Sequence, residues 1–207
     1  GKGGEEVARR REAGPGNITM AAGTTINAGR GNISLELGSG GNANPVGDIT
    51  LGTLRSQGAI AVNARGGNIF RAGAGATGEM PVVRANSAIF QTTGSGAIGS
   101  ATEPLRLRVE NLEATAGSGG AFFNSPNSGL TIGGARDLLD GISTEGGGNI
   151  EVTAKGDIAV IEPLLTAVTS LPPSEGGQGG IVPEAGNIVL NSIEGAVDTS
   201  TTSLDSK

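Results

Sequence analysis

Residues 148–160 read GNIEVTAKGDIAV, and this short phrase predicts the fold of the whole chain. A Gly-Asn or Gly-Asp pair opens each half, and an apolar residue then alternates with a small or polar one. Alternation with a period of two is typical of a β-strand that buries one face. The two halves begin at Gly148 and Gly156, so the strands are short and Gly-rich corners separate them.

The Gly-Asn-Ile form of this phrase recurs along the chain. We expect its glycine to adopt a positive φ at a corner. We expect its asparagine to tolerate the left-handed region, to bond local backbone groups and to form ladders with equivalent amides. The isoleucine should point inward and stack on its equivalents. The corner pairs are Gly16 and Asn17, Gly31 and Asn32, Gly67 and Asn68, Gly148 and Asn149, and Gly186 and Asn187.

Repetition of one phrase favours a stacked solenoid over a sandwich or a barrel. Only 2% of the residues are aromatic, which suits the narrow interior of a β-helix better than the wider space between two sandwich sheets. We therefore predict an all-β parallel β-helix with Gly-rich corners and loop excursions. At roughly 20–30 residues per coil, it would have about seven to ten coils and form a rod on the order of 30–50 Å long.

The repeat also predicts the organisation of the chain. Residues 1–15 are charged and read as a linker outside the fold, 16–199 as the β-helical repeat domain, and 200–207 as a polar tail. Three segments interrupt the rhythm and are expected to be corner excursions, namely 72–81, 133–148 (with one helical turn at 136–140) and 162–180.

Composition narrows the chemistry. The chain has 207 residues, 39 of them Gly, a formal net charge of −6, and no Cys, His, Trp or Tyr. It therefore lacks the commonest general base and metal ligand, disulfides and thiolate zinc sites. We expect no cofactor, no metal and no transmembrane helix, since no run of 18 apolar residues occurs. The first fifteen residues contain no apolar core, so a signal for export would lie upstream.

A carbohydrate-active β-helix enzyme is the main alternative, because parallel β-helices can carry clustered carboxylates that act as acid and base on polysaccharides. The candidates are Glu151, Asp157 and Glu162 with Lys155, and the pair Asp137 and Asp140. Outward strand positions and turns explain these residues more simply, so we do not expect an enzyme. If Glu151, Lys155 and Asp157 did act together, they should converge in one groove within about 6–8 Å.

Other ligand classes find weaker support. The Gly-rich stretches 38–41, 117–120 and 146–149 lack the Lys-Ser/Thr of a phosphate loop, and no Gly-Gly-x-Gly-x-Asp calcium repeat occurs. An acidic chain with scattered arginines is not expected to bind nucleic acid.

Arg106 and Arg108 alternate with Leu105, Leu107 and Val109. This pattern predicts an exposed face of arginines over a buried aliphatic face. A functional alternative is a basic stripe that binds anionic glycans, such as a sulfated polysaccharide.

Residues 96–134 resemble the repeat of filamentous-haemagglutinin-like exoproteins, and looser similarity extends over roughly 16–199. The segment 44–49 (Asn-Pro-Val-Gly-Asp-Ile) departs from the Asn-Pro-Asn-Gly-Ile motif of that family's secretion domain, so the chain looks more like the repetitive shaft. The matching positions are Ile98-Gly99, Pro104-Leu105-Arg106, Val109, Asn111-Leu112, Ala114, Gly119-Gly120, Phe123, Asn127, Gly129-Leu130 and Ile132-Gly133.

The resemblance implies a right-handed parallel β-helix within a large bacterial adhesin that is secreted or attached to the cell surface, typically by two-partner secretion. It implies a structural and adhesive role, with loops that display binding sites. Its partners would be a host or surface glycan or protein, and neighbouring coils of the same polypeptide or other copies of it. A self-assembling extracellular matrix or filament component is a further alternative.

Overall fold

The computed structural model describes residues 16–37, 47–73, 80–135, 139–166, 185–199 and 204–206. These residues form twenty-one β-strands and no helix, and every strand pair is parallel. An eleven-stranded sheet contains β1 (Ile18–Thr19), β2 (Thr25–Asn27), β4 (Ile49–Leu51), β5 (Thr53–Arg55), β7 (Ile69–Arg71), β8 (Val83–Arg84), β10 (Ala97–Ile98), β11 (Leu105–Arg108), β13 (Gly120–Ser125), β16 (Ile150–Ala154) and β19 (Ile188–Ser192). A ten-stranded sheet contains β3 (Ile33–Glu36), β6 (Ala59–Arg65), β9 (Ser87–Thr92), β12 (Asn111–Ala116), β14 (Leu130–Ile132), β15 (Ile142–Thr144), β17 (Ile158–Val160), β18 (Leu164–Thr166), β20 (Val197–Asp198) and β21 (Leu204–Ser206).

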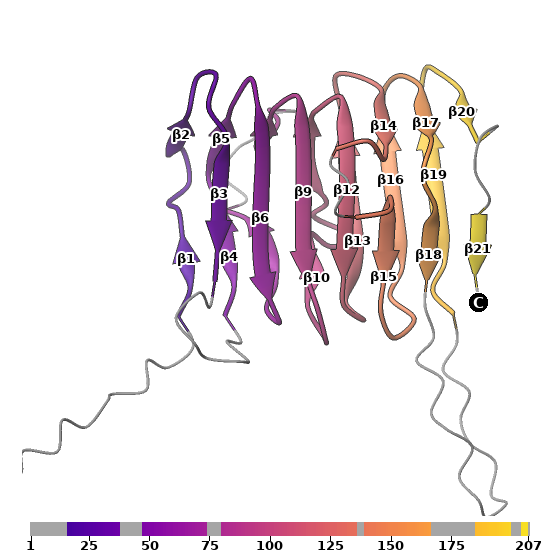
Figure 1. Cartoon of the computed structure of the whole chain (residues 1–207), viewed down its shortest axis with the longest axis horizontal. Helices are drawn as coiled ribbons and strands as arrows, with labels where there is room; N and C mark the ends of the chain where they lie inside the picture. The colour runs from indigo at the N-terminus through magenta and orange to yellow at the C-terminus, as the bar shows by residue number, and fades with distance from the viewer. Residues whose placement is uncertain are drawn as a thin grey trace, which may run out of the picture.

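The chain returns to the same place after every three strands. β1 pairs with β4, β2 with β5 and β3 with β6, and the strands up to β18 and β21 follow the same rule except for β11, which pairs with β13. We call each set of three consecutive strands a triplet, so the described residues contain seven triplets. Figure 1 shows the strands side by side along the long axis, in sequence order from indigo to yellow. This arrangement is consistent with a β-helix-like solenoid.

The path of the chain changes between the fourth and fifth triplets. β13 pairs with both β10 and β11 on one side and with β16 on the other. β12 correspondingly pairs with β14 along its first half and with β15 along its second half. The long strand β13 thus takes the place of the two short strands β10 and β11. In the other sheet, the long strand β12 is followed by the two short strands β14 and β15.

The inward side chains of both sheets form one continuous core that runs from Ile33 to Leu164. Its first column is the isoleucine of the repeated phrase. Ile18 pairs with Ile49, Ile49 with Ile69, and Ile69 with Ile98, and the column continues through Ala121 to Ile150 and Ile188. Ile49, Ile69, Ile98 and Ile150 are fully buried, so the predicted inward stacking of the isoleucine is confirmed.

The all-β parallel architecture predicted from the sequence is also confirmed, with seven triplets at the lower end of the expected number of coils. Two of the predicted excursions are partly wrong, because 142–144 and 164–166 are the strands β15 and β18. Residues 204–206, expected within a polar tail, form β21. The predicted linker 1–15, residues 136–138 of the helical turn predicted at 136–140, and most of the excursions 72–81 and 162–180 lie outside the described residues.

Candidate functional site

The glycines of the repeated phrase serve a purpose that differs from the predicted one. None of the five corner glycines has a positive φ, so that prediction is wrong. A methyl group on Gly47 would run into the carbonyl oxygen of Gly16, and one on Gly67 would run into that of Gly47. The same clash recurs between Gly186 and Gly148. The glycines therefore form a column in which successive backbones touch, and they are needed for close approach rather than for a left-handed turn.

Buried threonines complete this glycine column. The hydroxyl of Thr144 donates a 2.5 Å hydrogen bond to the carbonyl oxygen of Gly148, and that of Thr166 donates a 3.1 Å bond to the oxygen of Gly186. Both side chains are almost completely buried. Because a buried carbonyl without a partner is costly, these hydroxyls stabilise the corners. The threonines end strands of the other sheet, and the sequence analysis did not single them out.

The phrase asparagines form a second column beside the glycines. The Oδ1 atom of Asn17 accepts a 2.8 Å hydrogen bond from the backbone N–H of Asp48, and Asp48 accepts both the backbone and the side-chain N–H of Asn68 at 2.8 and 2.9 Å. Asn149 likewise accepts the N–H of Asn187 at 2.8 Å. Each carboxamide or carboxylate therefore receives a donor from the next triplet. The predicted bonding to local backbone groups and the left-handed conformation are not observed, since the residue with positive φ other than glycine among the described residues is Arg65.

The copy at Gly31 and Asn32 belongs to the other sheet. Asn32 accepts the N–H of Ala59 at 2.8 Å, and Ile33 pairs with Ile60. The nearest atom to a methyl group on Gly31 would be the Ala28 carbonyl oxygen at 3.3 Å, so this glycine is less constrained. The same phrase is therefore used at two different corners of a triplet.

We expect Asn149→Ala to lower the free energy of unfolding by about 1 kcal/mol, because the N–H of Asn187 loses its acceptor. Asn149→Asp is the matched control. It keeps an acceptor oxygen, as Asp48 does at the equivalent corner, and should unfold close to the wild type. Urea unfolding followed by circular dichroism would measure both. Equal losses for the two variants would show that the hydrogen bond is not the cause.

Arg106 and Arg108 lie on β11, where the predicted alternation is observed. Leu105 and Leu107 are fully buried, Arg106 is half-buried and Arg108 is exposed. The arginines therefore cover a buried aliphatic row, as the simpler interpretation predicted.

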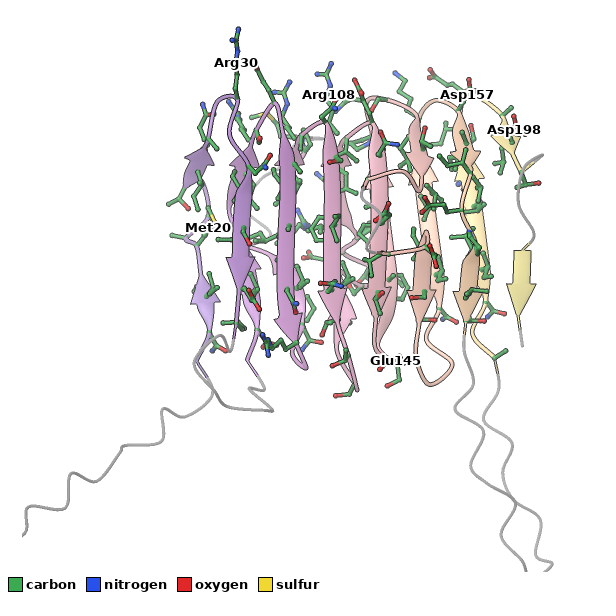
Figure 2. All side chains as sticks on the ribbon, viewed as in Figure 1. Met20, Arg30, Arg108, Glu145, Asp157 and Asp198 are labelled. Atoms are coloured by element: carbon green, nitrogen blue, oxygen red, sulfur yellow. The ribbon has the colours of Figure 1, made fainter. Side chains whose placement is uncertain are left out.

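The register of the sheet adds a feature that the sequence analysis missed. Arg55, Arg84 and Arg108 are the last residues of β5, β8 and β11, and they pair in register as Arg55 with Arg84 and Arg84 with Arg108. We call these three residues the arginine row. Asn27, the last residue of β2, occupies the preceding position. Figure 2 shows Arg108 at the same edge of the molecule as Arg30, in the corner after β2. A signal in the sequence was available, because each arginine directly follows a buried aliphatic residue at the end of a strand.

Two depressions lie on the surface beside this row, and Arg55 is not among the described residues that line them. The first has a volume of about 460 Å³ and the second of about 410 Å³, and Arg84 and Arg108 line both of them. The first continues over the corners after the strands, past Asn86 and Glu110, to Gly129. The second lies beside Met80 and Asn127. These depressions mark the candidate functional surface of the described residues.

Two of the residues suggested for an acid–base pair have other partners. Glu151 lies on β16, and Lys155 directly follows the last residue of that strand. Asp157 lies beyond the next corner, where it accepts the N–H of Ala196 at 2.8 Å. Lys155 pairs with Glu194 at 3.7 Å. Lys155 and Asp157 therefore have structural partners, and the catalytic arrangement of Glu151, Lys155 and Asp157 stays a hypothesis. The pair of Asp137 and Asp140 cannot be placed because Asp137 lies outside the described residues.

Glu162 has a structural role. Its two carboxylate oxygens accept the N–H groups of Gly134 at 2.9 Å and Gly141 at 2.8 Å. The buried Glu113 accepts the N–H of Ala135 at 2.6 Å. The carboxylates therefore attach both described ends of the excursion between β14 and β15 to the body of the sheets.

The Gly-rich stretches also serve packing. Gly148 belongs to the glycine column, and a methyl group on it would lie 2.6 Å from the Gly117 carbonyl oxygen. Among the described residues, no group of three or more acidic side chains is arranged to hold a metal ion.

No known family model, curated protein or solved structure matches the chain. No helix in the described part of the chain is long and apolar enough to cross a membrane.

Proposed function

We propose that this chain is a right-handed parallel β-helix that serves as a shaft segment of a large exported bacterial protein similar to filamentous haemagglutinin. The observation that supports it best is the pairing of each strand except β11 with the third strand after it, together with an inward column that holds isoleucine at every position but Ala121. Parallel strands joined by crossover connections are right-handed in nearly all proteins, which supports the proposed hand.

In this proposal the chain forms a rod that extends away from the cell and displays binding segments, without catalysis or a cofactor. Each triplet contacts its neighbours alone, so stacking extends a stiff rod without requiring a larger core. The excursion between β14 and β15, attached at both described ends by Glu113 and Glu162, gives the rod a side branch with fixed ends. A host or surface glycan or protein would bind at such excursions or in other parts of the exported protein.

Surface labelling of the producing bacterium tests this proposal. Antibodies raised against the purified chain should label intact cells or appear with material released into the medium, and protease added outside should remove the signal. A cytoplasmic protein of known abundance serves as the control for lysis. Labelling that appears only after the cells are broken would contradict an exported shaft.

Self-assembly is a second candidate, favoured by the last triplet. Among the strands that the structure describes, β19 pairs with β16 alone, and Val189, Ile193 and Val197 on or beside β19 and β20 are 47%, 64% and 40% exposed. An unpaired strand edge with apolar side chains can pair with another chain or with a further coil. In the proposed shaft, neighbouring coils of the same polypeptide or other copies would cover this end.

We expect the isolated chain to associate with increasing concentration, and Ile193→Lys to weaken that association, because a charge at the edge resists burial. Multi-angle light scattering would measure the mass of both proteins. Met80→Lys is the control, because Met80 is 69% exposed but lies away from the last triplet. A chain that remains monomeric throughout, or variants that behave alike, would contradict assembly through this end.

A further inference from the structure

We propose that the arginine row is a binding site for a linear acidic polysaccharide, whose carboxylate or sulfate groups run along the stacking direction. The proposal rests on the register of β5, β8 and β11, so it stands or falls separately from export and from the shaft.

The arginine row places like charges on neighbouring strands. Strands lie about 4.8 Å apart, and like charges directly opposite each other are unfavourable. The ion pairs of the described residues lie elsewhere, as Arg65 with Glu36, Arg71 with Glu103 and Lys155 with Glu194. Within the described ranges, none of the three row arginines forms an ion pair. A row of this kind is expected to attract anions, in a chain that is otherwise acidic.

The surroundings of the row favour a polymer over a single anion. An exposed ion pair contributes little by itself, so useful affinity requires several simultaneous contacts. The two depressions extend the surface along the stacking direction, and both contain Arg84 and Arg108. The exposed amide of Asn86 borders the first depression and can bond to sugar hydroxyls. A chain with an acidic group on successive sugars would repeat its charge along the same line as the arginines.

The same surface is less suited to nucleic acid or protein. Single-stranded nucleic acid binds largely by stacking bases on aromatic side chains, and none of the described residues that line the depressions is aromatic. Protein interfaces usually centre on buried aromatic or aliphatic anchors. Met80 is the large exposed apolar side chain among the described lining residues.

Binding of polygalacturonate and of dextran sulfate to the full chain, measured by calorimetry at low and physiological salt, tests the proposal. We expect at least one of the two to bind, with affinity that falls as salt rises. Arg84→Gln should weaken binding about tenfold, as expected for loss of one desolvated charge contact. The triple variant Arg55→Gln, Arg84→Gln and Arg108→Gln should abolish binding. Comparison of the two polymers shows whether the site takes carboxylate or sulfate.

Arg65→Gln is the matched control, because it removes the same charge from a residue already paired with Glu36. It should bind within about twofold of the wild type. Glu110→Gln should bind more tightly, because it removes a carboxylate from the first depression. Circular dichroism verifies that each variant is folded. The proposal is overturned if neither polymer binds, if a folded triple variant binds as the wild type does, or if single-stranded nucleic acid binds as tightly as the preferred polysaccharide.

Discussion

Gly67→Ala should destabilise the chain by about 3 kcal/mol or more, although it adds a single methyl group. Gly67 does not have a positive φ, so an alanine fits its backbone conformation. The added methyl group would instead collide with the backbone of Gly47 in the preceding triplet, and the atoms it meets are the oxygen, carbon and nitrogen of that residue. A backbone cannot rotate away as a side chain can. The stacking of β7 on β4 must therefore shift or separate, and with it the core column at Ile69.

Gly16→Ala is the matched control for this prediction. Gly16 opens the same phrase in the first triplet, and a methyl group on it would have no atom within 4 Å. Replacing glycine with alanine at an unhindered site reduces the entropy of the unfolded chain, so this variant should be unchanged or up to about 1 kcal/mol more stable. Urea unfolding followed by circular dichroism compares the two. Equal midpoints for Gly16→Ala and Gly67→Ala would show that the close approach of the backbones does not limit the stack.

The repeated phrase predicted the element type because its information is local. Alternation within Ile150–Val152 indicates a strand with one buried face, and repetition indicates stacking of like on like. Both are consequences of neighbours in the sequence. The inward isoleucines, the buried leucines of β11 and the parallel all-β class followed from such neighbours, and the structure confirms them.

The need for glycine at these positions could not be predicted in the same way. It depends on which copies of the phrase stack on each other in neighbouring triplets. Gly31 and Gly67 open identical phrases, Gly-Asn-Ile, but they occupy different corners of the triplet. A methyl group on Gly67 would overlap the backbone of Gly47, whereas one on Gly31 would lie 3.3 Å from the carbonyl oxygen of Ala28. The short spacing from Gly58 to Gly67 or from Gly148 to Gly156 is a step between corners, whereas the column of touching glycines joins residues one triplet apart. A local motif does not distinguish these two distances.

The arginine row was hidden for a related reason. Arg55, Arg84 and Arg108 are separated by 29 and 24 residues, because the corners between them differ in length. Despite those differences in corner length, the strands pair in a register that places the three arginines opposite one another on neighbouring strands. In the sequence, Arg106 and Arg108 stand out as a pair on one strand, but the arginine that lies beside Arg108 in the sheet is Arg84 from the preceding triplet. The residues that form one surface of a stacked repeat come from different strands, so they can be identified only when the register of the strands is known.

Phe123→Ala should destabilise the chain by about 3–5 kcal/mol, the usual range for removing a buried phenylalanine. Phe123 is 1% exposed and lies on β13, which pairs with β10, β11 and β16. Its ring centroid is 5.6 Å from that of Phe90 on β9, in the other sheet. Small aliphatic side chains fill most of the core, so loss of one of its two largest buried rings leaves a cavity that these neighbours cannot close.

Two further variants separate the loss of volume from the loss of the ring pair. Phe123→Leu retains most of the volume and should lose less than half as much stability as Phe123→Ala. Phe70→Ala, at a half-buried position on β7, should lose clearly less stability than Phe123→Ala.

In a double-mutant cycle, Phe90→Ala and Phe123→Ala should be non-additive by about 0.5–1.5 kcal/mol, because their rings are in contact. Full additivity would show that contact between the two rings contributes nothing to stability. Coupling of the expected size would show that the ring pair helps to hold the two sheets together where β13 replaces two strands.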